Sequence, residues 1–531
     1  MKSGCPAAFC GKITIILDNI IYAKIYTIGS AKRGEKSDRK RYDTNLKVRD
    51  LMNFKSETGQ ALQLQVLSGT GREKIHAAVL ETLQDVGVVV QESSSLELLK
   101  QAGATTAGNR VYLPGKMVEQ ALETVPDGFS LYDRGTGKRL DFKGKEFHFG
   151  PGPSTTHTID PYSGVRRYPC KEDTRNAARI MDALENIDFV MDFGTIQDVP
   201  TRYADLHLLQ AILENTTKPV VHWGFNVENC ETVIEMCKAV SGSLEELQKR
   251  PFLAFFTCPN TPLLHTGEAL EKMAYAAKMG LPLVYVSAPT AGATSPVTLA
   301  GTLVATLAEC LSGLVIHQLN APGSPFAIGG VTGATDMKTM AMSYGCPEFN
   351  LMHAGLTEMA HAYGLPLWGT AGCTDAKTVD EQAAVEATAS IIMSAMSGTN
   401  MIHDVGYTEG GNCSNPAMLV MSDEIIGYAR RLVKGIRVDD TALGLDAIKR
   451  VGPMGEFVTD KHTYENFKQE LWVPGLMDRS SYQNWSANGN LTMGEKAMAR
   501  AKELIENHRP EALDHSAAKQ IERIISKVSG Y

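Results

Sequence analysis

The sequence predicts an α/β protein of the (β/α)8 TIM-barrel class, with an N-terminal helical region before the barrel and a C-terminal helical extension after it. Between residues 146 and 417, eight short runs of β-branched or aromatic residues alternate with helical stretches, at intervals of about 30–40 residues. This alternation is typical of βα units and a parallel sheet. Eight such units close most economically into a barrel, and an open doubly wound sheet is the alternative.

The first 51 residues differ in charge from the rest of the chain. They hold 11 Lys and Arg against 5 Asp and Glu, whereas residues 52–531 hold 41 against 55. An apolar run at 13–28 is interrupted by Asp18 and Lys24, so it is too short and too polar for a membrane span. We expect a disordered leader, or an upstream start that is not translated, with Met52 as the true first residue.

A small helical region is predicted next, over residues 69–130. It contains the amphipathic runs HAAVLETLQDVGV and SLELLKQAGA, followed by NRVYLPGKMVEQALETVP. Val111 and Leu113 alternate around Tyr112 as a brief strand, and Pro114 can occupy the first turn of the following helix.

The barrel is predicted over residues 146–417. The expected strands are 146–150, 188–194, 219–224, 252–258, 282–288, 325–330, 366–372 and 401–406. Several of the intervening helical stretches end at a glycine, which is a common helix C-cap. From residue 418 to residue 531 the pattern is helical again, and this extension is expected to pack beside the barrel.

Composition excludes several classes of protein. With 43% hydrophobic residues, 21% charged residues and a net charge of −8, the chain is neither disordered nor membrane-spanning, and it is not a generic nucleic-acid binder. The ten cysteines are scattered without a CxxC pair, which indicates reduced thiols of a cytoplasmic protein. Motifs of the HExxH and GxxxxGK[ST] type are absent, so no metal site is predicted.

In a barrel the active site lies at the C-terminal ends of the strands. The loops there are rich in Gly, Pro, Ser and Thr, which lets a flat, bulky group approach the backbone closely. Aromatic residues recur beside polar ones, so a cage for an organic cation can be assembled. An aromatic beside a strand more often packs in the core, and a lone histidine there is more often structural. For His403 a functional role is weighed equally with a structural one, because Asp404 and Glu409 are close in sequence.

Four separated blocks of sequence carry a resemblance to a known family. They are LLKQAGATTAGNRVYLPGKMVEQALETVP, FGPGPSTTHTIDPYSGVRRYPCKED, GLPLWGTAGCTDAKTVDEQAA and MDRSSYQNWSANGNLTMGEKAMARAKELIENHRP. Together they resemble the trimethylamine methyltransferase superfamily, from about Gly69 to the C-terminus. The resemblance implies a (β/α)8 barrel with an open mouth. It also implies transfer of a methyl group from an amine to the corrinoid (cobalamin) of a small partner protein, with no cofactor bound by this chain itself.

The trimethylamine enzymes of that family use pyrrolysine, whereas this chain contains only the standard twenty residues. A quaternary ammonium leaves as a neutral amine when Co(I) attacks its methyl group, so it needs no general acid. The resemblance therefore favours a quaternary substrate, as in the glycine betaine branch. The residues expected to serve are Trp223, Phe225 and Tyr407 for the headgroup, Asn260 and His403 for the carboxylate end and catalysis, Asp375 and Glu409 for substrate, and Gly329, Gly330 and Gly372 for the corrinoid.

The expected partners are thus a corrinoid protein and a small methylated amine, with no nucleic acid and no membrane, and a homo-oligomer is expected for a soluble enzyme. Three alternatives remain open at this point. The first is a tertiary amine methyltransferase of the trimethylamine type. The second is a Schiff-base lyase that uses Lys377, and the third is a betaine-binding or corrinoid-docking protein without catalytic activity.

Overall fold

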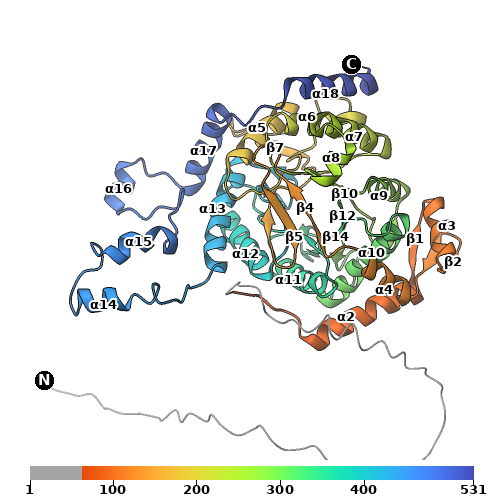
Figure 1. The fold of residues 1–531 in the computed structure, drawn as a ribbon, viewed down its shortest axis with the longest axis horizontal. Helices are drawn as coiled ribbons and strands as arrows, with labels where there is room; N and C mark the ends of the chain where they lie inside the picture. The colour runs from red at the N-terminus through yellow and green to blue at the C-terminus, as the bar shows by residue number, and fades with distance from the viewer. Residues whose placement is uncertain (1–61, 531) are drawn as a thin grey trace, which may run out of the picture. The chain divides into compact units, whose positions relative to one another are not determined.

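A computed structural model describes residues 62–530, so the predicted leader at 1–51 lies outside the described residues. Its centre is a curled parallel sheet of seven strands (Figure 1). In spatial order these are β6 (His148–Phe149), β18 (Met401–His403), β17 (Leu367–Thr370), β14 (Phe326–Gly330), β12 (Leu283–Ser287), β10 (Leu253–Thr257) and β9 (Val220–His222). All neighbouring strands pair in parallel, and each falls inside a segment predicted as a strand.

The eighth predicted strand, 188–194, does not form as a regular strand. A single bridge joins Val190 to Val220 of β9. At the other edge, the backbone N–H of Asp188 donates to the Phe149 carbonyl of β6 at 2.7 Å. The regular ladder fails there because the Asp188 carboxylate, in place of a backbone carbonyl, accepts the Phe149 N–H at 3.0 Å. The prediction of a strand over 188–194 was therefore wrong, although the segment does bond to both edge strands.

The concave side of the sheet holds its own apolar cluster, which includes Val221, Phe256, Val286, Trp368 and Met401. The hairpin of β4 (Gly128–Tyr132) and β5 (Arg139–Lys143) adds Phe129, Leu131, Leu140 and Phe142 to the same cluster. Alternate strand residues, such as Phe255 and Tyr285, belong to the larger outer cluster under the helices. This alternation follows from the two-residue period of a strand, and it fills the interior with side chains.

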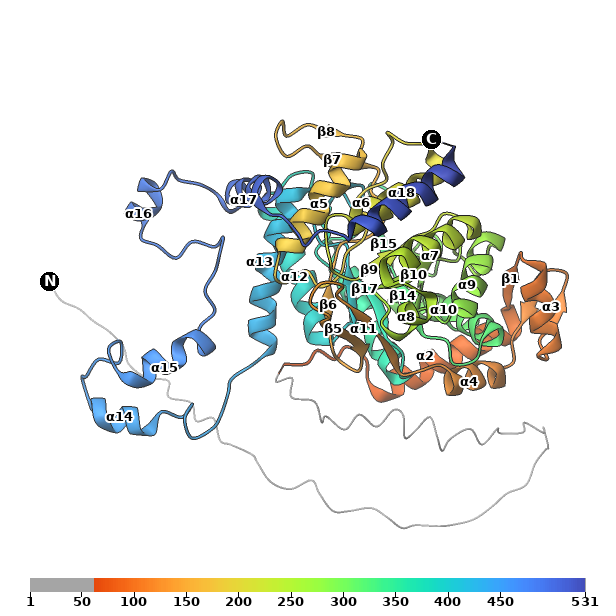
Figure 2. The ribbon, with the colours of Figure 1, turned by 45° about the horizontal axis from the view of Figure 1, so that its top comes forward.

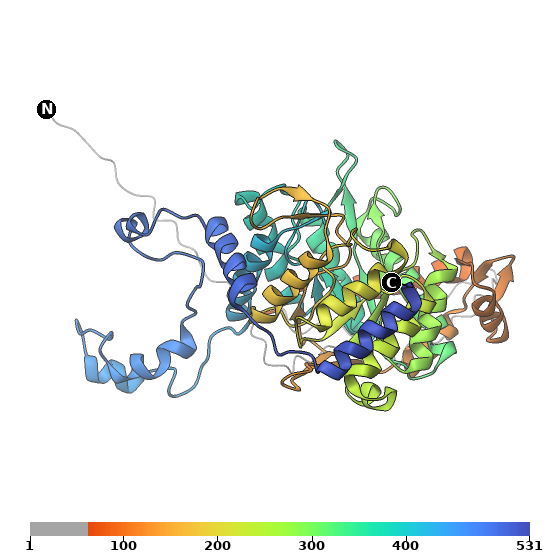
Figure 3. The same ribbon diagram turned by 90° about the horizontal axis from the view of Figure 1, so that it is seen from above.

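Helices cover the convex side of the sheet and surround the strands in Figure 1. In the view from above, the C-terminal helix lies beside the helices of this layer (Figure 3). The helices of the layer are α5 (Lys171–Ala183), η2 (Thr201–Tyr203), α6 (Ala204–Leu213), α7 (Val227–Ser241), α8 (Leu244–Lys249), α9 (Gly267–Met279), α10 (Leu299–Asn320), α11 (Pro347–Ala362), α12 (Glu381–Ser397) and α13 (Pro416–Val433). Local sequence sets their ends. Asn226 caps α7 by accepting the Asn229 N–H, and Gly280 ends α9 in the left-handed conformation.

One of these helices, α10, is long and apolar enough to cross a membrane by length and composition alone. Within the fold, 72% of its most apolar window is buried. It packs against α2 and α4 on one side and against strands β12 and β14 on the other, which accounts for its apolar surface. The eight cysteines of residues 62–530 are free thiols.

The N-terminal region contains α2 (Gly69–Glu81), η1 (Thr82–Val86), β1 (Val88–Val90), α3 (Ser93–Gln101), β2 (Thr105–Ala107), β3 (Arg110–Tyr112) and α4 (Gly115–Thr124). It is less purely helical than its sequence pattern predicts. Strand β1 pairs with β3 and, in parallel, with β11 (Leu264–His265), which belongs to the loop after β10. That pairing could not be read from local periodicity, because its partner lies far away in the chain.

Two small sheets stand on the loops that follow the strands of the main sheet. One joins β7 (His157–Ile159) and β8 (Arg166–Arg167) to β19 (Tyr407–Thr408) and β20 (Cys413–Ser414). The other joins β13 (Thr290–Ala291), β15 (Gly333–Thr335) and β16 (Met342–Ser343). Figure 2 shows β7 and β8 at the top of the view, on the side opposite α2 and α4. These sheets therefore build walls around the C-terminal edge of the main sheet.

After α13 the chain continues through α14 (Leu445–Val451), α15 (Lys461–Glu470), α16 (Tyr482–Ala487), α17 (Met493–Asn507) and α18 (His515–Ser529). Helix α17 packs against α13 and α5, and α18 packs against α7. The predicted helical character of this extension agrees with these elements. The domain boundaries proposed from the sequence, at 69–130, 146–417 and 418–531, stay predictions.

Candidate functional site at the ends of the sheet strands

A row of aromatic rings crosses the interior of the sheet. Trp223, directly after β9, lies 5.7 Å from Phe256, and Phe256 lies 5.7 Å from Trp368, both measured between ring centroids. Trp368 is also 5.4 Å from Phe189 and stacks on His403 at 4.5 Å. Trp223 is half-buried, whereas the others are buried. The row therefore ends in a partly open indole ring next to the last residue of β9.

His403 is a neutral, oriented side chain. Its Nδ1 donates to the Gly369 carbonyl at 2.7 Å, and burial lowers its pKa to about 3. In that tautomer Nε2 carries no proton, and it lies 3.5 Å from Oδ2 of Asp404. The imidazole therefore presents an acceptor to the carboxyl group of the next residue.

Two carboxyl groups, those of the half-buried Asp192 and the buried Asp404, lie close enough at the strand ends for the charge of one to act on the other. Burial raises the pKa of Asp192 to about 7, while the Ser154 N–H donates to it at 3.2 Å. Burial and then the charge of Asp192 raise the pKa of Asp404 to about 8. Within residues 62–530, neither carboxyl group forms an ion pair with a lysine or arginine. The two carboxyl groups therefore either carry negative charge or keep their protons, and no lysine or arginine of the described residues neutralises them.

The loop after β6 is fitted closely against this pair. A β-carbon on Gly152 would lie 1.6 Å from Oδ1 of Asp404, so only glycine leaves room for the carboxyl group. The buried Tyr407 hydroxyl donates to the Gly152 carbonyl, and its ring lies 5.4 Å from Phe193. Gly152 therefore leaves the space that the Asp404 carboxyl group occupies, and Tyr407 holds the loop that contains Gly152.

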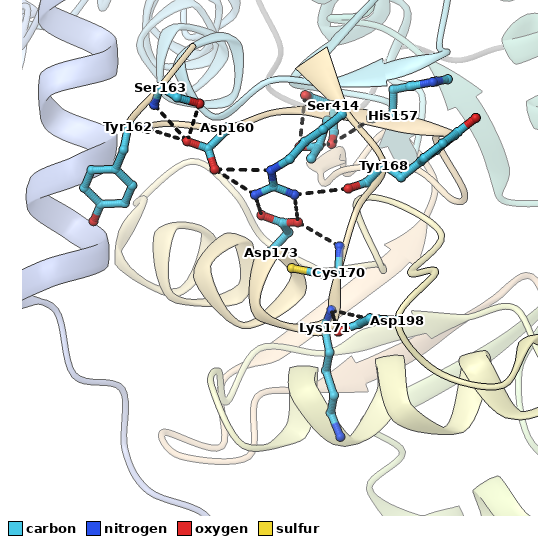
Figure 4. Close-up of polar contacts among 12 residues, drawn as sticks. His157, Asp160, Tyr162, Ser163, Tyr168, Cys170, Lys171, Asp173, Asp198 and Ser414 are labelled. Carbon is cyan, nitrogen blue, oxygen red and sulfur yellow. Dashed lines mark hydrogen bonds and ion pairs between the residues drawn. The ribbon is translucent and has the colours of Figure 1, made fainter. Parts of the chain in front are cut away.

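The segment that contains this loop is fixed at its far end by Arg167. Its guanidinium donates to Asp160 at 2.8 Å and to Asp173 at 2.6 Å (Figure 4). Hydrogen bonds from the Ser163 backbone and from Arg167 lower the pKa of Asp160 to about 2. Next to it, Arg166 pairs with Glu409 at 2.8 Å and so joins β8 to the loop after β19. These pairs hold β7 and β8 in place beside the site.

The residues predicted for the headgroup are not gathered into one cage. Trp223 contacts Phe256, Tyr407 contacts Phe193, and Phe225 packs on a separate small cluster with Ile196. In the described part of the chain, no ring contact joins any two of the three predicted residues. Trp223 is the one that borders the aromatic row.

The polar residues predicted for substrate also have structural partners. Asn260 is exposed and exchanges two backbone hydrogen bonds with Leu264, at 2.8 and 3.0 Å. Asp375 accepts hydrogen bonds from Ser343 Oγ and from the Tyr344 and Gly345 N–H groups, which fixes the loop after β16. Glu409 is occupied by Arg166, as described above. His403 is the predicted polar residue that lies in the site.

The three glycines predicted for the corrinoid are buried at close packing contacts. A β-carbon on Gly329 would lie 2.6 Å from Val286, and one on Gly330 would lie 2.3 Å from Leu356, on the helix side. Gly372 has φ +79° and packs against Val405. Their role toward a corrinoid stays a prediction.

Lys377, the residue of the Schiff-base alternative, is exposed, and its Nζ donates to the Asp375 carbonyl at 2.5 Å. A Schiff-base lysine needs a desolvated or charge-crowded amine, and this environment supplies neither.

Sequence reasoning did not select Asp192, Asp404, Gly152 or Trp368 as site residues. Each carried a signal, since Asp192, Trp368 and Asp404 lie in predicted strands and Gly152 lies in the loop after the first of them. The missing information was the side of the strand that each residue faces and the depth to which it is buried.

Fold and site together define an α/β scaffold of the enzyme type, with a curled parallel sheet and, at the ends of its strands, two carboxyl groups that have no lysine or arginine partner among the described residues. The chain belongs to the trimethylamine methyltransferase (MTTB) family, whose model matches residues 31–529. The resemblance inferred from the four sequence blocks is thereby confirmed.

Relatives in this family include methyltransferases of two kinds. The trimethylamine methyltransferase MttB of Desulfitobacterium hafniense (strain DSM 10664 / DCB-2) is 33% identical over 462 residues, which cover 85% of this chain and 92% of that protein. The glycine betaine methyltransferase of Desulfitobacterium hafniense (strain Y51) is 30% identical over 474 residues, covering 88% and 98%. Among solved structures, the monomethylamine methyltransferase MtmB of Methanosarcina barkeri aligns with a TM-score of 0.49 at 13% identity, over 87% of this chain and 91% of that chain.

Proposed function

We propose that this protein transfers a methyl group from a quaternary ammonium compound of the glycine betaine type to the Co(I) corrinoid of a partner protein. The observation that supports this function is the Asp192–Asp404 pair, which has no lysine or arginine partner within residues 62–530 and lies next to His403, at the opposite end of the aromatic row from Trp223. A ligand that carries a permanent positive charge and apolar methyl groups matches both features.

The chemistry of the leaving group supports the same class of substrate. The partner's corrinoid supplies the Co(I) nucleophile. A quaternary nitrogen departs as a neutral amine, so the protein needs no special electrophile, in keeping with a chain of twenty standard residues. A glycine betaine methyltransferase is among its relatives.

The residues of this chain then act by position. Trp223 and the aromatic row hold the methyl groups in a dry environment, while the two carboxyl groups balance the charge. Since the positive charge on nitrogen fades in the transition state, strong counter-charge would stabilise the ground state more than the transition state. Carboxyl groups that retain protons near neutral pH are a moderate counter-charge, which suits this requirement.

The scaffold is proposed to be a complete barrel. The bonds from Asp188 to Phe149 and from Val190 to Pro219 join the two edges of the seven-stranded sheet through one segment. A closed ring would hold Asp192 and Asp404 at adjacent positions on the same rim.

The experiment is a methyl-transfer assay with purified protein, reduced corrinoid protein or free cob(I)alamin, and a panel of betaines with trimethylamine as the tertiary amine. Formation of methylcobalamin from one or more betaines, and none from trimethylamine, is the expected result. Binding of betaines without turnover would instead indicate a non-catalytic binding protein.

One observation favours a second candidate function, a tertiary amine methyltransferase. A carboxyl group that keeps its proton near neutral pH, as Asp404 does, is a suitable general acid for a departing amine. The 33% identical relative is named for trimethylamine. Turnover of trimethylamine with all betaines untouched would select this candidate.

A further inference from the structure

The chain between α13 and α17 forms an arm, residues 434–492, which carries α14, α15 and α16. Helix α17 packs back on α13, so the arm leaves and rejoins the body next to the same helix. Figures 1 and 2 show α14, α15 and α16 projecting beyond α13, away from the main sheet. Within the arm, Ala447 and Asn466 are the residues that are buried.

The arm is enriched in exposed apolar residues relative to its length. Of the twenty-five large hydrophobic residues that are exposed in residues 62–530, thirteen belong to it. They are Ile436, Val438, Leu443, Leu445, Ile448, Met454, Phe457, Val458, Tyr464, Leu471, Val473, Tyr482 and Leu491. So many exposed large apolar side chains on one short segment are typical of an interaction site.

Polar contacts within the arm give it a defined shape without covering these side chains. Arg450 pairs with Asp460 at 2.7 Å, and Asp460 also caps α15. The His462 ring bonds to the Thr441 carbonyl at 2.9 Å, which ties α15 to the segment before α14. Polar groups therefore join α14 to α15, while many apolar side chains of the arm remain exposed.

The base of the arm is attached firmly to α13. The Glu424 carboxylate accepts the N–H groups of Gly475, Leu476 and Met477, each at 3.0 Å. Tyr428 meets Trp472 edge to face at 5.6 Å. Because the arm is anchored at its base, its apolar side chains stay exposed to water in the isolated chain. A partner that buries them must therefore be bound permanently.

The charges on the arm restrict the kind of partner. Its seven lysines and arginines balance eight aspartates and glutamates. A surface that binds anionic lipid or nucleic acid would carry an excess of basic residues. Charges of both signs among apolar side chains instead suit a self-complementary contact, as in a two-fold interface between identical chains.

The corrinoid protein cannot be the permanent cover of the arm, because of the role that the proposed function gives it. A partner that accepts a methyl group must leave in order to deliver it, and it must approach the strand ends where the site lies. We propose that the arm is the assembly interface of this protein and that its occupant is the arm of a second copy of the same chain.

The test measures mass and does not depend on methyl transfer, so it can fail separately from the proposed function. Sedimentation velocity of the full chain at about 10 μM is expected to give at least twice the monomer mass of 57.6 kDa. The variant M454D/V458D/V473D changes three side chains that are 105%, 75% and 75% exposed. In a free arm these changes are harmless, whereas in an interface they bury three charges, so the variant is expected to be monomeric with an unchanged circular dichroism spectrum.

The matched control is Val385→Asp on α12, where the side chain is 68% exposed but lies outside the arm. This variant should keep the wild-type mass. A wild-type chain that is monomeric, or a triple variant that keeps the assembly, would overturn the proposal.

Hydrogen exchange provides a second measurement for the case in which the triple variant fails to fold. Amides of 436–476 in the wild-type chain should lose protection on dilution, as the copies separate. Protection that persists in a monomer would assign the cover to residues of the same chain, and flotation of monomers with lipid vesicles would assign it to a membrane. Either outcome would overturn the proposal.

Discussion

Oδ1 of Asp404 lies where a side chain on Gly152 would have to be, because a β-carbon on Gly152 would come within 1.6 Å of it. A glycine in one mouth loop thus determines where an acid in another loop can lie. Gly152→Ala must displace the Asp404 carboxyl group or the loop, and movement of the loop also takes the Gly152 carbonyl away from the Tyr407 hydroxyl. We expect methyl transfer to fall at least about tenfold, since small displacements of positioned groups cost rate.

The control for that variant is Gly267→Ala at the start of α9, where a β-carbon would meet nothing within 4 Å. It should keep wild-type activity. If Gly152→Ala kept full activity in the methylcobalamin assay, Asp404 would have no role that depends on its position.

The acid pair predicts a pH dependence of substrate binding. The carboxyl groups of Asp192 and Asp404 have pKa values of about 7 and about 8, so both become charged as the pH rises through this range. The dissociation constant of a betaine should therefore fall between about pH 6 and pH 9. Asp404→Asn should weaken binding at pH 9 and flatten the profile, as measured by calorimetric titration.

A matched control for Asp404→Asn is Asp423→Asn. Asp423 is another acid whose pKa burial raises, but it lies on α13, where it accepts the Asn186 N–H at 2.8 Å. Its pH profile for binding should match the wild type. An unchanged profile in Asp404→Asn would remove the acid pair from the binding site.

The same shifts affect stability. The pKa of Asp404 is about 8 in the folded protein, whereas the ordinary pKa of an aspartate is 3.8. Between pH 3.8 and about pH 8 the folded state therefore binds more protons than the unfolded chain. The free energy of unfolding contributed by this group therefore decreases as the pH rises over that interval. The difference in the free energy of unfolding between Asp404→Asn and the wild type should therefore shift in favour of the variant when the pH is raised from 5 to 8. Urea unfolding of both proteins at the two pH values measures this shift.

Trp223 is expected to contact the cationic headgroup. Loss of a cation–π contact of about 1–2 kcal/mol corresponds to roughly a 5- to 30-fold weaker betaine affinity for Trp223→Ala. Trp223→Phe should retain most of the affinity, because it keeps an aromatic face. Equal affinities for the alanine variant and the wild type would show that the headgroup binds elsewhere.

Arg167 should stabilise the folded protein at neutral pH and should stabilise it less in acid. Its partner Asp160 has a pKa lowered to about 2, so the stabilisation is present above the ordinary value of 3.8 and is lost as the pH falls toward 2. Arg167→Met should lower Tm at pH 7 by about 2–4 °C, the shift that about 1 kcal/mol produces in a large domain. The difference from the wild type should shrink below about pH 3 in thermal scans.

Lys377→Ala distinguishes the methyltransferase from the Schiff-base alternative. The exposed amine bonds to the backbone carbonyl of Asp375, and methyl transfer should proceed at the wild-type rate without it. Borohydride trapping of a substrate carbonyl on Lys377, with loss of activity in the variant, would contradict this expectation.

Local sequence was sufficient to predict seven strands of the main sheet and the resemblance to the family. Strands such as β10 and β12 are continuous apolar runs followed by helical stretches, and such patterns depend on neighbouring residues alone. Which residues form the site depends instead on contacts between distant parts of the chain. Asp404 meets Gly152, and Trp368 meets Phe189 and Phe256, across long stretches of chain. Burial and pKa are set by such neighbours, and local periodicity carries no information about them. For the same reason, the hydrogen bond by which Asp188 replaces a strand ladder and the apolar exposure of the arm emerged only from the folded chain.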